Sequence, residues 1–230
     1  MNVAIIVAAG SGSRMKSLKE PKQFAKVNGK PLLLYSLETF NSVNQIDAII
    51  VVTNEDSLSF VEELCKNTNI NKVKKVVSGG STRQESVLNG LKSVKEFVSE
   101  DSVVLIHDAA RPLVNETIIK ENIEGVHRFG AVVTALPATD TLLQSKDDET
   151  ISSSLNRKEM YQAQTPQSFL LGVIYRAHLL AQQDKLSATD DASIYVKYVQ
   201  KPLGIVKGDK RNFKITTEED LLILESYLNK

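Results

Sequence analysis

Short apolar runs alternate with longer amphipathic stretches along most of this 230-residue chain. Val3–Val7 and Ala48–Thr53 are rich in β-branched residues, which is typical of strands buried on both faces of a parallel sheet. Between such runs, apolar residues recur at helical spacing, as in Leu58–Asn67. The alternation of strand and helix predicts an α/β fold with a largely parallel sheet.

The remaining elements follow from the same two periodicities. Further strands are expected at Val73–Val77, Val103–Ile106, Ala131–Leu136, Gly204–Val206 and Asn212–Ile215. Further helices are expected at Pro31–Phe40, Arg83–Phe97, Glu116–Arg128, Leu170–Gln182 and Glu218–Leu228. Thr217, followed three residues later by Asp220, is typical of a capped start for the last helix. No linker or repeat interrupts the pattern, so we predict one domain over residues 1–230.

The strand–helix alternation breaks after Pro137. Thr139–Leu143 and Thr150–Ser154 are short runs of alternating polarity, joined by a charged turn at residues 146–149. This pattern predicts a β-hairpin arm over about residues 137–158. Because a lone hairpin with little apolar surface is barely stable in water, we expect the arm to pack against a second subunit of a homodimer.

Composition narrows the class of partner and the compartment. The 28 basic and 28 acidic residues cancel, so no overall field would attract nucleic acid or an anionic membrane. A single cysteine, Cys65, excludes an intrachain disulfide and a zinc site built on several cysteines. The apolar start of the chain lacks the basic region of a signal peptide and is too short to span a membrane. We therefore expect a soluble, cytoplasmic protein.

A small-residue loop directly follows the first expected strand. It comprises Ala8, Ala9, Gly10, Ser11, Gly12, Ser13 and Arg14. Such a loop lets successive backbone N–H groups point at phosphate oxygens. It lacks the Gly-Lys-Ser/Thr ending of a P-loop, and Met15 stands where a dinucleotide fingerprint needs a third small residue. An acidic residue at the end of the second strand is also missing, which counts against a dinucleotide-dependent oxidoreductase.

Two cations accompany this loop, Arg14 within it and Lys22 eight residues later. Taken singly, each is better explained as a solvated surface charge. Together with the loop, they favour a triphosphate cradle, because negative charge builds on phosphorus during phosphoryl transfer.

A second glycine pair, Gly79-Gly80, lies between a strand and a helix start. Its backbone groups suit recognition of a base edge, with Ser86 one turn into the helix. The alternative is a simple turn in which Ser81 caps the helix.

The most informative strand end carries Asp108, with Arg111 three residues later. Ligands of open α/β sheets bind at the carboxyl edge, and Mg²⁺ takes one or two protein oxygens beside those of phosphates and water. The alternative, in which Asp108 caps a helix and pairs with Arg111, has equal weight from the residues alone. His107 is interpreted as structural.

Taken in order, these motifs resemble those of the 2-C-methyl-D-erythritol 4-phosphate cytidylyltransferases. The matching motifs are AAGSGSRM, PKQF, GGSTRQES, HDAARP, the DT of the arm, QTPQSF, TDDAS and NFKITTEEDL, which extend from residue 8 to about residue 221. The resemblance implies a single-domain, Rossmann-like fold of the nucleotide-diphosphosugar-transferase type, with a mixed, mostly parallel sheet and a protruding hairpin arm. It also implies transfer of a cytidylyl group from CTP to a small polyol phosphate, with a divalent cation such as Mg²⁺.

The resemblance further implies roles for individual residues. It assigns catalysis to Arg14, Lys22 and Lys214. Arg14 and Lys22 would stabilise charge on the α-phosphorus, and Lys214 would complete the polyol and phosphate site. It assigns nucleotide binding to Ala8, Ala9, Gly10, Ser11, Gly12, Ser13, Gly79, Gly80, Ser81, Arg83 and Ser86. It assigns substrate binding to Asp108, Ala109, Arg111, Thr141, Arg157, Thr165 and Thr189, with Asp108 also holding the metal. Thr141 and Arg157 would reach the site of the neighbouring subunit.

The chain departs from the family pattern at two positions, and one close relative keeps the acceptor open. This chain has Val7 where many members have proline, and Ser81 where many have an acidic residue. The stretch from PATDT to QTPQSF also resembles ribitol 5-phosphate cytidylyltransferases, whereas HDAARP and TDDAS favour the methylerythritol enzymes. A non-catalytic nucleotide-binding regulator is disfavoured because Arg14, Lys22, Asp108 and Lys214 are all present.

Overall fold

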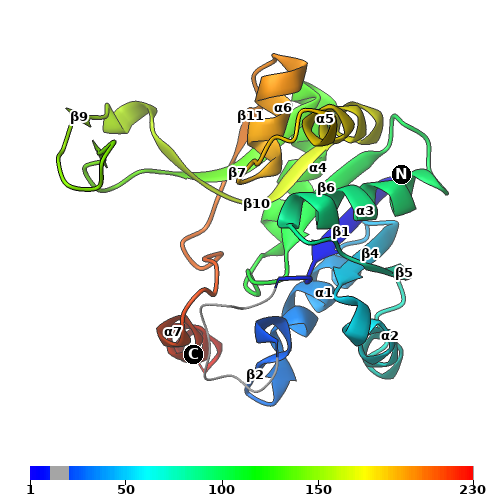
Figure 1. The fold of residues 1–230 in the computed structure, drawn as a ribbon. Coiled ribbons are helices and arrows are strands. Elements are labelled where there is room, and N and C mark those ends of the chain that lie inside the picture. The colour runs from blue at the N-terminus through cyan, green and yellow to red at the C-terminus, as the bar shows by residue number, and fades with distance from the viewer. Residues whose placement is uncertain (11–20, 230) are drawn as a thin grey trace.

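The structure, a computed structural model, describes residues 1–10 and 21–229. The expected roles of Ser11, Gly12, Ser13 and Arg14 therefore lie outside the described residues. At its centre is one sheet of seven strands: β1 (Asn2–Val7), β4 (Ala48–Thr53), β5 (Val73–Ser78), β6 (Val103–Asp108), β7 (Ala131–Pro137), β10 (Tyr161–Leu170) and β11 (Gly204–Lys207). Their order across the sheet is β11-β7-β10-β6-β1-β4-β5 (Figure 1).

The direction of the strands confirms a mixed, mostly parallel sheet. β1 pairs in parallel with both β4 and β6, and β4 pairs in parallel with β5. β10 alone runs antiparallel to its neighbours β6 and β7, and β11 is again parallel to β7. The carboxyl ends of β1, β4, β5 and β6 consequently meet at one edge of the sheet.

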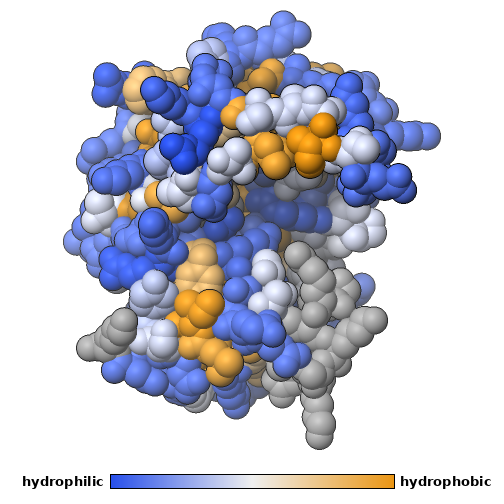
Figure 2. All heavy atoms as spheres, turned by 90° about the vertical axis from the view of Figure 1, so that its left-hand side faces the viewer, coloured by the Kyte–Doolittle hydropathy of each residue, from blue (hydrophilic) through white to orange (hydrophobic). Residues whose placement is uncertain are grey.

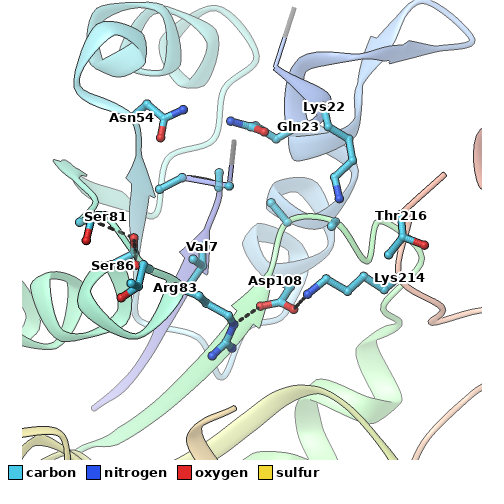
Figure 3. A pocket seen from close by; sticks show the side chains of 17 residues that line it. Val7, Lys22, Gln23, Asn54, Ser81, Arg83, Ser86, Asp108, Lys214 and Thr216 are labelled. Carbon is cyan, nitrogen blue, oxygen red and sulfur yellow. Dashed lines mark hydrogen bonds and ion pairs between the residues drawn. The ribbon is translucent and has the colours of Figure 1, made fainter. Parts of the chain in front are cut away.

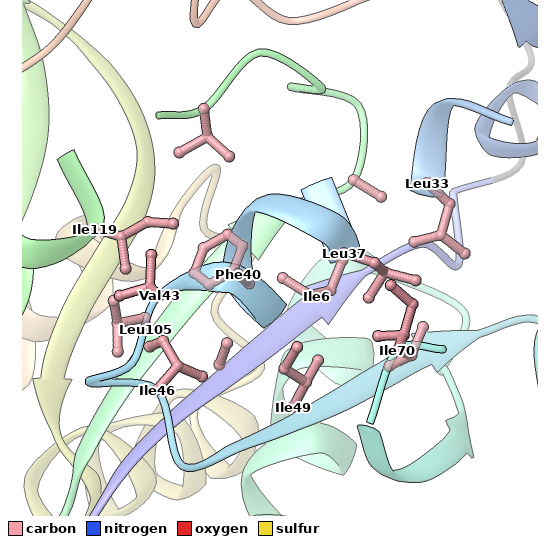
Figure 4. Close-up of a cluster of buried hydrophobic side chains, with 14 of the residues drawn as sticks. Ile6, Leu33, Leu37, Phe40, Val43, Ile46, Ile49, Ile70, Leu105 and Ile119 are labelled. Carbon is pink, nitrogen blue, oxygen red and sulfur yellow. The ribbon is translucent and has the colours of Figure 1, made fainter. Parts of the chain in front are cut away.

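Helices cover both faces of the sheet (Figure 1). One face packs against α1 (Leu32–Ser42), α2 (Leu58–Asn67) and α4 (Glu116–Phe129). The other packs against α3 (Arg83–Lys95), α5 (Leu171–Gln183) and α6 (Asp191–Val199). Strand residues alternate between the two layers: Ile6 and Leu105 join the first cluster, with Phe40 at its centre (Figure 4), whereas Ile5 and Ile106 join the second.

The C-terminal helix α7 (Glu218–Leu228) lies apart from the sheet, beside the short strands β2 (Lys26–Val27) and β3 (Lys30–Pro31). Val27, Ile215 and Leu224 form a small third apolar cluster there. The predicted capping of α7 is confirmed, because Thr217 and Asp220 form a reciprocal capping box. In the part of the chain that the structure describes, no helix is both long and apolar enough to cross a membrane.

Three sequence expectations about elements are corrected. The expected strand Asn212–Ile215 is wrong: this segment is irregular, and its side chains bond to Thr165 in β10 and Asp108 in β6 instead of joining a ladder. β10 was not expected, because its buried residues Gln164, Gln167 and Ser168 are polar. Helix α6 was also missed, since its nine residues are too few to show a clear period.

The hairpin arm is present but has less regular structure than expected. β8 (Leu143–Gln144) and β9 (Ser153–Ser154) pair antiparallel over two residues each, and the arm projects from the rest of the molecule (Figure 1). Leu143 and Ile151 are 55% and 60% exposed. Figure 2, which shows this side of the molecule, has apolar side chains exposed in its upper part, where the arm lies.

Candidate active site

A pocket of about 450 Å³ opens at the carboxyl ends of β1 and β6. It is formed by the loop after β1, the start of α3, the end of β6 and the segment before α7, which are far apart in the sequence (Figure 3). The expected site residues that line it are Ala8, Ala9, Gly10, Lys22, Gly80, Ser81, Arg83, Ser86, Asp108, Ala109 and Lys214. The fold thus brings most of the predicted nucleotide and catalytic residues to one place.

The two glycine-containing loops approach each other closely at Gly79. A Cβ atom added to Gly79 would lie 2.5 Å from the Cβ of Ala9 and 2.8 Å from Oγ of Ser86. No real side chain fits at such distances, so glycine is needed at this position for the loops to meet. Gly79 itself is not part of the pocket wall, and its contribution is to let the Ala8–Gly10 segment and the start of α3 share one wall.

Hydrogen bonds at the start of α3 fix the second loop. The Gly80 amide donates to Oγ of Ser86 at 3.0 Å, and that hydroxyl donates to the Thr82 carbonyl at 2.8 Å. Thr82, rather than Ser81, caps the helix by accepting from the Glu85 amide. Ser81 instead donates its amide and hydroxyl to the Glu85 carboxylate. The exposed backbone of this loop is therefore held in a fixed shape at the pocket wall.

Asp108, the last residue of β6, lies between two cations on the pocket wall (Figure 3). Arg83 Nε donates to its Oδ1 at 2.9 Å, and Lys214 Nζ donates to its Oδ2 at 2.7 Å. The Asp108 side chain is 10% exposed, against 25% for Arg83 and 36% for Lys214. The sequence alternative that paired Asp108 with Arg111 is therefore wrong.

The charge state of Asp108 follows from this arrangement. Burial alone would raise the pKa of its carboxyl group, but the charges of Arg83 and Lys214 outweigh burial and hold the pKa well below its usual range. The carboxylate is ionised throughout the physiological pH range. Among the described residues no three His, Cys, Asp or Glu side chains form a metal cluster, so Asp108 offers a single carboxylate. That donor set fits a divalent cation held mainly by phosphate oxygens and water.

Lys22 lies in the opposite wall of the pocket, in the short 3-10 helix η1 (Lys22–Phe24). Its Nζ donates to the Ile215 carbonyl at 2.6 Å, which links the segment after the first loop to the segment before α7. In Figure 3 the amine points toward the side of the pocket that holds Lys214 and Asp108. Two lysines from distant segments therefore face one cavity, as a site for a polyphosphate requires.

Arg111, Thr165 and His107 support Asp108 from behind and do not line the pocket. Arg111 donates to the carbonyls of Asn212 and Ala163, and burial lowers the pKa of its guanidinium. The Thr165 hydroxyl, on an irregular stretch of β10, accepts from the Asp108 amide at 3.1 Å. It then donates to Nδ1 of His107, whose Nε2 donates to the Arg111 carbonyl. The pattern places the proton of a neutral imidazole on Nε2 and confirms His107 as structural.

This buried imidazole makes stability depend on pH. Burial lowers the pKa of His107 to about 4 from an ordinary 6.5, so the unfolded chain takes up this proton first as pH falls. The neutral His107 side chain makes its full contribution to the free energy of unfolding above pH 6.5. This contribution is lost between about pH 6.5 and 4, at up to about 1.4 kcal/mol per pH unit. We expect His107→Gln to flatten the fall of urea-unfolding free energy across that window. The matched control is His127→Gln, at an exposed site, which should keep the wild-type dependence of unfolding free energy on pH. If that dependence is equally steep in wild type and His107→Gln, the assignment to His107 is contradicted.

Three expected substrate-binding residues lie away from the pocket. Thr141 and Arg157 are exposed on the hairpin arm, where Arg157 donates to the Thr139 carbonyl at 2.9 Å. Thr189 is exposed just before α6. Within the described residues of this one chain, the structure does not bring these three side chains to Asp108 or Lys214.

The pocket also contains residues that the sequence did not single out. Gln23, Asn54 and Thr216 line it, and Asp191 lies behind it as a second carboxylate partner of Arg83. Gln23 and Asp191 stand inside PKQF and TDDAS, so the motifs contained the signal without indicating a role. Thr216 likewise stands inside NFKITTEEDL, whereas Asn54 follows a strand end and nothing in its local sequence marks it.

The chain is similar in sequence to known proteins. A family model for 2-C-methyl-D-erythritol 4-phosphate cytidylyltransferase (IspD) matches residues 2–230. The chain is 42% identical over 229 residues to the protein of that name from Syntrophus aciditrophicus (strain SB), covering 99% of this chain and 96% of that protein. It is 37% identical over 226 residues to ribitol-5-phosphate cytidylyltransferase from Streptococcus agalactiae serotype V, covering 98% of this chain and 94% of that protein.

The fold agrees with these sequence matches. The crystal structure of 4-diphosphocytidyl-2C-methyl-D-erythritol synthase from Anaerococcus prevotii DSM 20548 matches with a TM-score of 0.86 and 29% identity, covering 100% of this chain and 96% of that one. The family match spans every element that builds the pocket, from β1 to the segment before α7. The chain therefore belongs to the IspD family of cytidylyltransferases.

Proposed function

We propose that this enzyme transfers a cytidylyl group from CTP to 2-C-methyl-D-erythritol 4-phosphate, forming 4-diphosphocytidyl-2-C-methyl-D-erythritol and pyrophosphate. The observation that best supports nucleotidyl transfer is that the Asp108–Lys214 pair faces Lys22 across one pocket at the carboxyl edge of the sheet. The choice of acceptor is supported by the higher identity to the methylerythritol relative, 42% against 37%.

In the proposed reaction, a phosphate oxygen of the acceptor attacks the α-phosphorus of CTP. The new bond joins that oxygen to the α-phosphorus, and the bond to the bridging oxygen of the β-phosphate breaks, so that pyrophosphate leaves with the electron pair. A phosphate monoester is already anionic at neutral pH, so the attack needs no general base. This agrees with the structure, in which His107 is buried with both ring nitrogens hydrogen-bonded.

The proposed contribution of the protein is positioning and neutralisation of charge. Lys22 and Lys214 bring positive charge to the pocket from opposite walls, and Arg14, outside the described residues, is proposed to join them. The backbone of Ala8–Gly10 and Gly80–Ser81 is proposed to hold the nucleotide, with Ala109 beside it. Asp108 would hold a divalent cation such as Mg²⁺, which supplies Lewis-acid stabilisation of the phosphates when bound.

A second acceptor, ribitol 5-phosphate, is favoured by a specific observation. The ribitol-5-phosphate relative covers 98% of this chain, almost as much as the methylerythritol relative. We therefore test both acceptors with CTP and Mg²⁺ and measure the initial rate of pyrophosphate release. The expected result is a kcat/KM for 2-C-methyl-D-erythritol 4-phosphate at least about tenfold above that for ribitol 5-phosphate. The reverse preference would assign the ribitol product.

One control shows that the measured activity belongs to this chain. Lys22→Ala, purified in parallel, should lose pyrophosphate release with both acceptors. An activity that persists equally in that variant would come from a contaminant or from a different site.

The proposed assembly is a homodimer in which the arm of one protomer reaches its partner. Leu143 and Ile151 expose most of their apolar surface on the arm, and a second copy is the partner proposed to cover them. Thr141 and Arg157 lie on this same arm, so such a dimer would carry residues remote from the pocket in one chain to the acceptor site of the other. The cytoplasm is the proposed compartment, in keeping with the single, buried Cys65.

A further inference from the structure

The Arg83 guanidinium joins two carboxylates on different sides of the pocket wall. Its Nε donates to Asp108 Oδ1 at 2.9 Å, and its Nη2 donates to Asp191 Oδ2 at 2.9 Å. Asp108 faces the pocket, whereas the Asp191 side chain is fully buried behind it. A single planar group therefore connects a carboxylate at the site with one that no ligand in the pocket can touch.

Asp191 is held from the other side by His178. The His178 ring, on α5, is fully buried, and its Nε2 lies 3.2 Å from Asp191 Oδ1. Among the described residues its Nδ1 has no hydrogen-bond partner. Because Asp191 occupies the first turn of α6, the positive end of that helix also favours its charge. Asp191 thus has fixed contacts to α3 and α5 while it lies at the start of a third helix.

Stability alone does not account for this buried ion pair. The surrounding layer contains apolar residues such as Val87, Ile174 and Ile194. Apolar side chains of similar size are often as stabilising as an ion pair in such a place, because burying charges costs solvation. An ion pair, unlike an apolar contact, also fixes the orientation of the side chains that form it. A guanidinium that donates from two edges is fixed in both position and plane, which a lysine cannot achieve.

We propose that Asp191 is a positioning residue of the active site. Braced by His178, it holds the Arg83 guanidinium so that Nε of Arg83 fixes one oxygen of Asp108 and leaves the other for Lys214. The orientation of Asp108 toward the acceptor and the phosphates of CTP is then set from α5 and α6, behind the pocket. This inference rests on the proposed role of Asp108, and the experiment below separates the two.

The test compares Asp191→Asn with Asp190→Asn. Both remove one carboxylate at the start of α6, and asparagine still caps a helix at position 190, but only Asp191 contacts Arg83. For Asp191→Asn we expect kcat/KM for the acceptor to fall about tenfold, with CTP binding at unchanged stoichiometry by calorimetry. Asp190→Asn should keep near-wild-type turnover. Near-wild-type kcat/KM in Asp191→Asn would overturn the proposal.

A double variant distinguishes positioning from general structural damage. If Asp191 acts through Arg83, adding Asp191→Asn to Arg83→Gln should cost little more than Arg83→Gln alone. Additive losses would overturn the proposal. Should Asp191→Asn not fold, His178→Leu tests the same contact from its far end: a fall in acceptor kcat/KM at unchanged CTP stoichiometry supports the proposal, and unchanged kcat/KM overturns it. If Asp108→Asn itself keeps full activity, the proposed function fails, whatever Asp191 does.

Discussion

Replacing Asp108 with asparagine is expected to lower kcat/KM at least about a hundredfold, because the amide removes a charge that Arg83 and Lys214 both contact. The same change leaves two cations without their shared carboxylate. Removing one partner of a buried pair costs about 3–5 kcal/mol, and the partial exposure of both cations brings our expectation nearer to about 2 kcal/mol. Initial rates and urea unfolding measure the two effects separately.

Asp56→Asn is the matched control for this change. Asp56 is an exposed aspartate in the 3-10 helix η2 (Glu55–Ser57), outside the pocket. Asp56→Asn should have the same urea-unfolding free energy and the same turnover as wild type. Substantial turnover in Asp108→Asn would mean that the carboxylate is structural and that the site of phosphate chemistry lies elsewhere.

Lys22→Ala is the second change with a large expected effect. Lys22 brings a positive charge to the wall opposite Lys214, and its removal should reduce stabilisation of the transition state while the pocket keeps its shape. Loss of one preorganised group of this kind lowers kcat about a hundredfold to a thousandfold. We expect the fall in kcat to exceed any rise in the KM for CTP, as for an interaction strongest in the transition state.

Lys26→Ala provides the comparison for Lys22→Ala. Lys26 is an exposed lysine in β2, four residues later, and does not line the pocket. A loss of activity confined to Lys22→Ala ties the effect to the pocket, whereas equal losses in both variants would point to a change in this whole segment.

Most of the sheet was predictable because its strands are continuous apolar runs. β4 and α2 have the boundaries that the sequence predicts, since period and burial agree there. β10 was not predicted because its buried residues are largely polar and form hydrogen bonds with residues distant in the sequence. Ser168 Oγ donates to Asn122 on α4, and Gln167 Nε2 donates to Asp190. Such pairings are invisible to a pattern that counts only apolar residues.

Many residues that line the pocket could be predicted from the sequence, but the contacts between them could not. One of the two interpretations that the residues left open paired Asp108 with Arg111, which is three positions away. The actual partners are 25 and 106 positions away. The spacing of residues in the sequence indicates which side chains share a face of one helix or strand. An ion pair between different elements depends on the order of the strands in the sheet, which is known only from the three-dimensional fold.

The bond from Lys22 to the Ile215 carbonyl has a consequence for how the enzyme is made. It closes a loop of 193 residues, and the Asp108–Lys214 pair closes one of 106. During synthesis the chain emerges from its N-terminus, so β1, β4, β5 and β6 can associate well before Lys214 leaves the ribosome. A nascent chain that ends before that point has the pocket wall formed by β1, α3 and β6 but lacks Lys214. The pocket with both lysines, Lys22 and Lys214, therefore forms only after the segment before α7 has been synthesised.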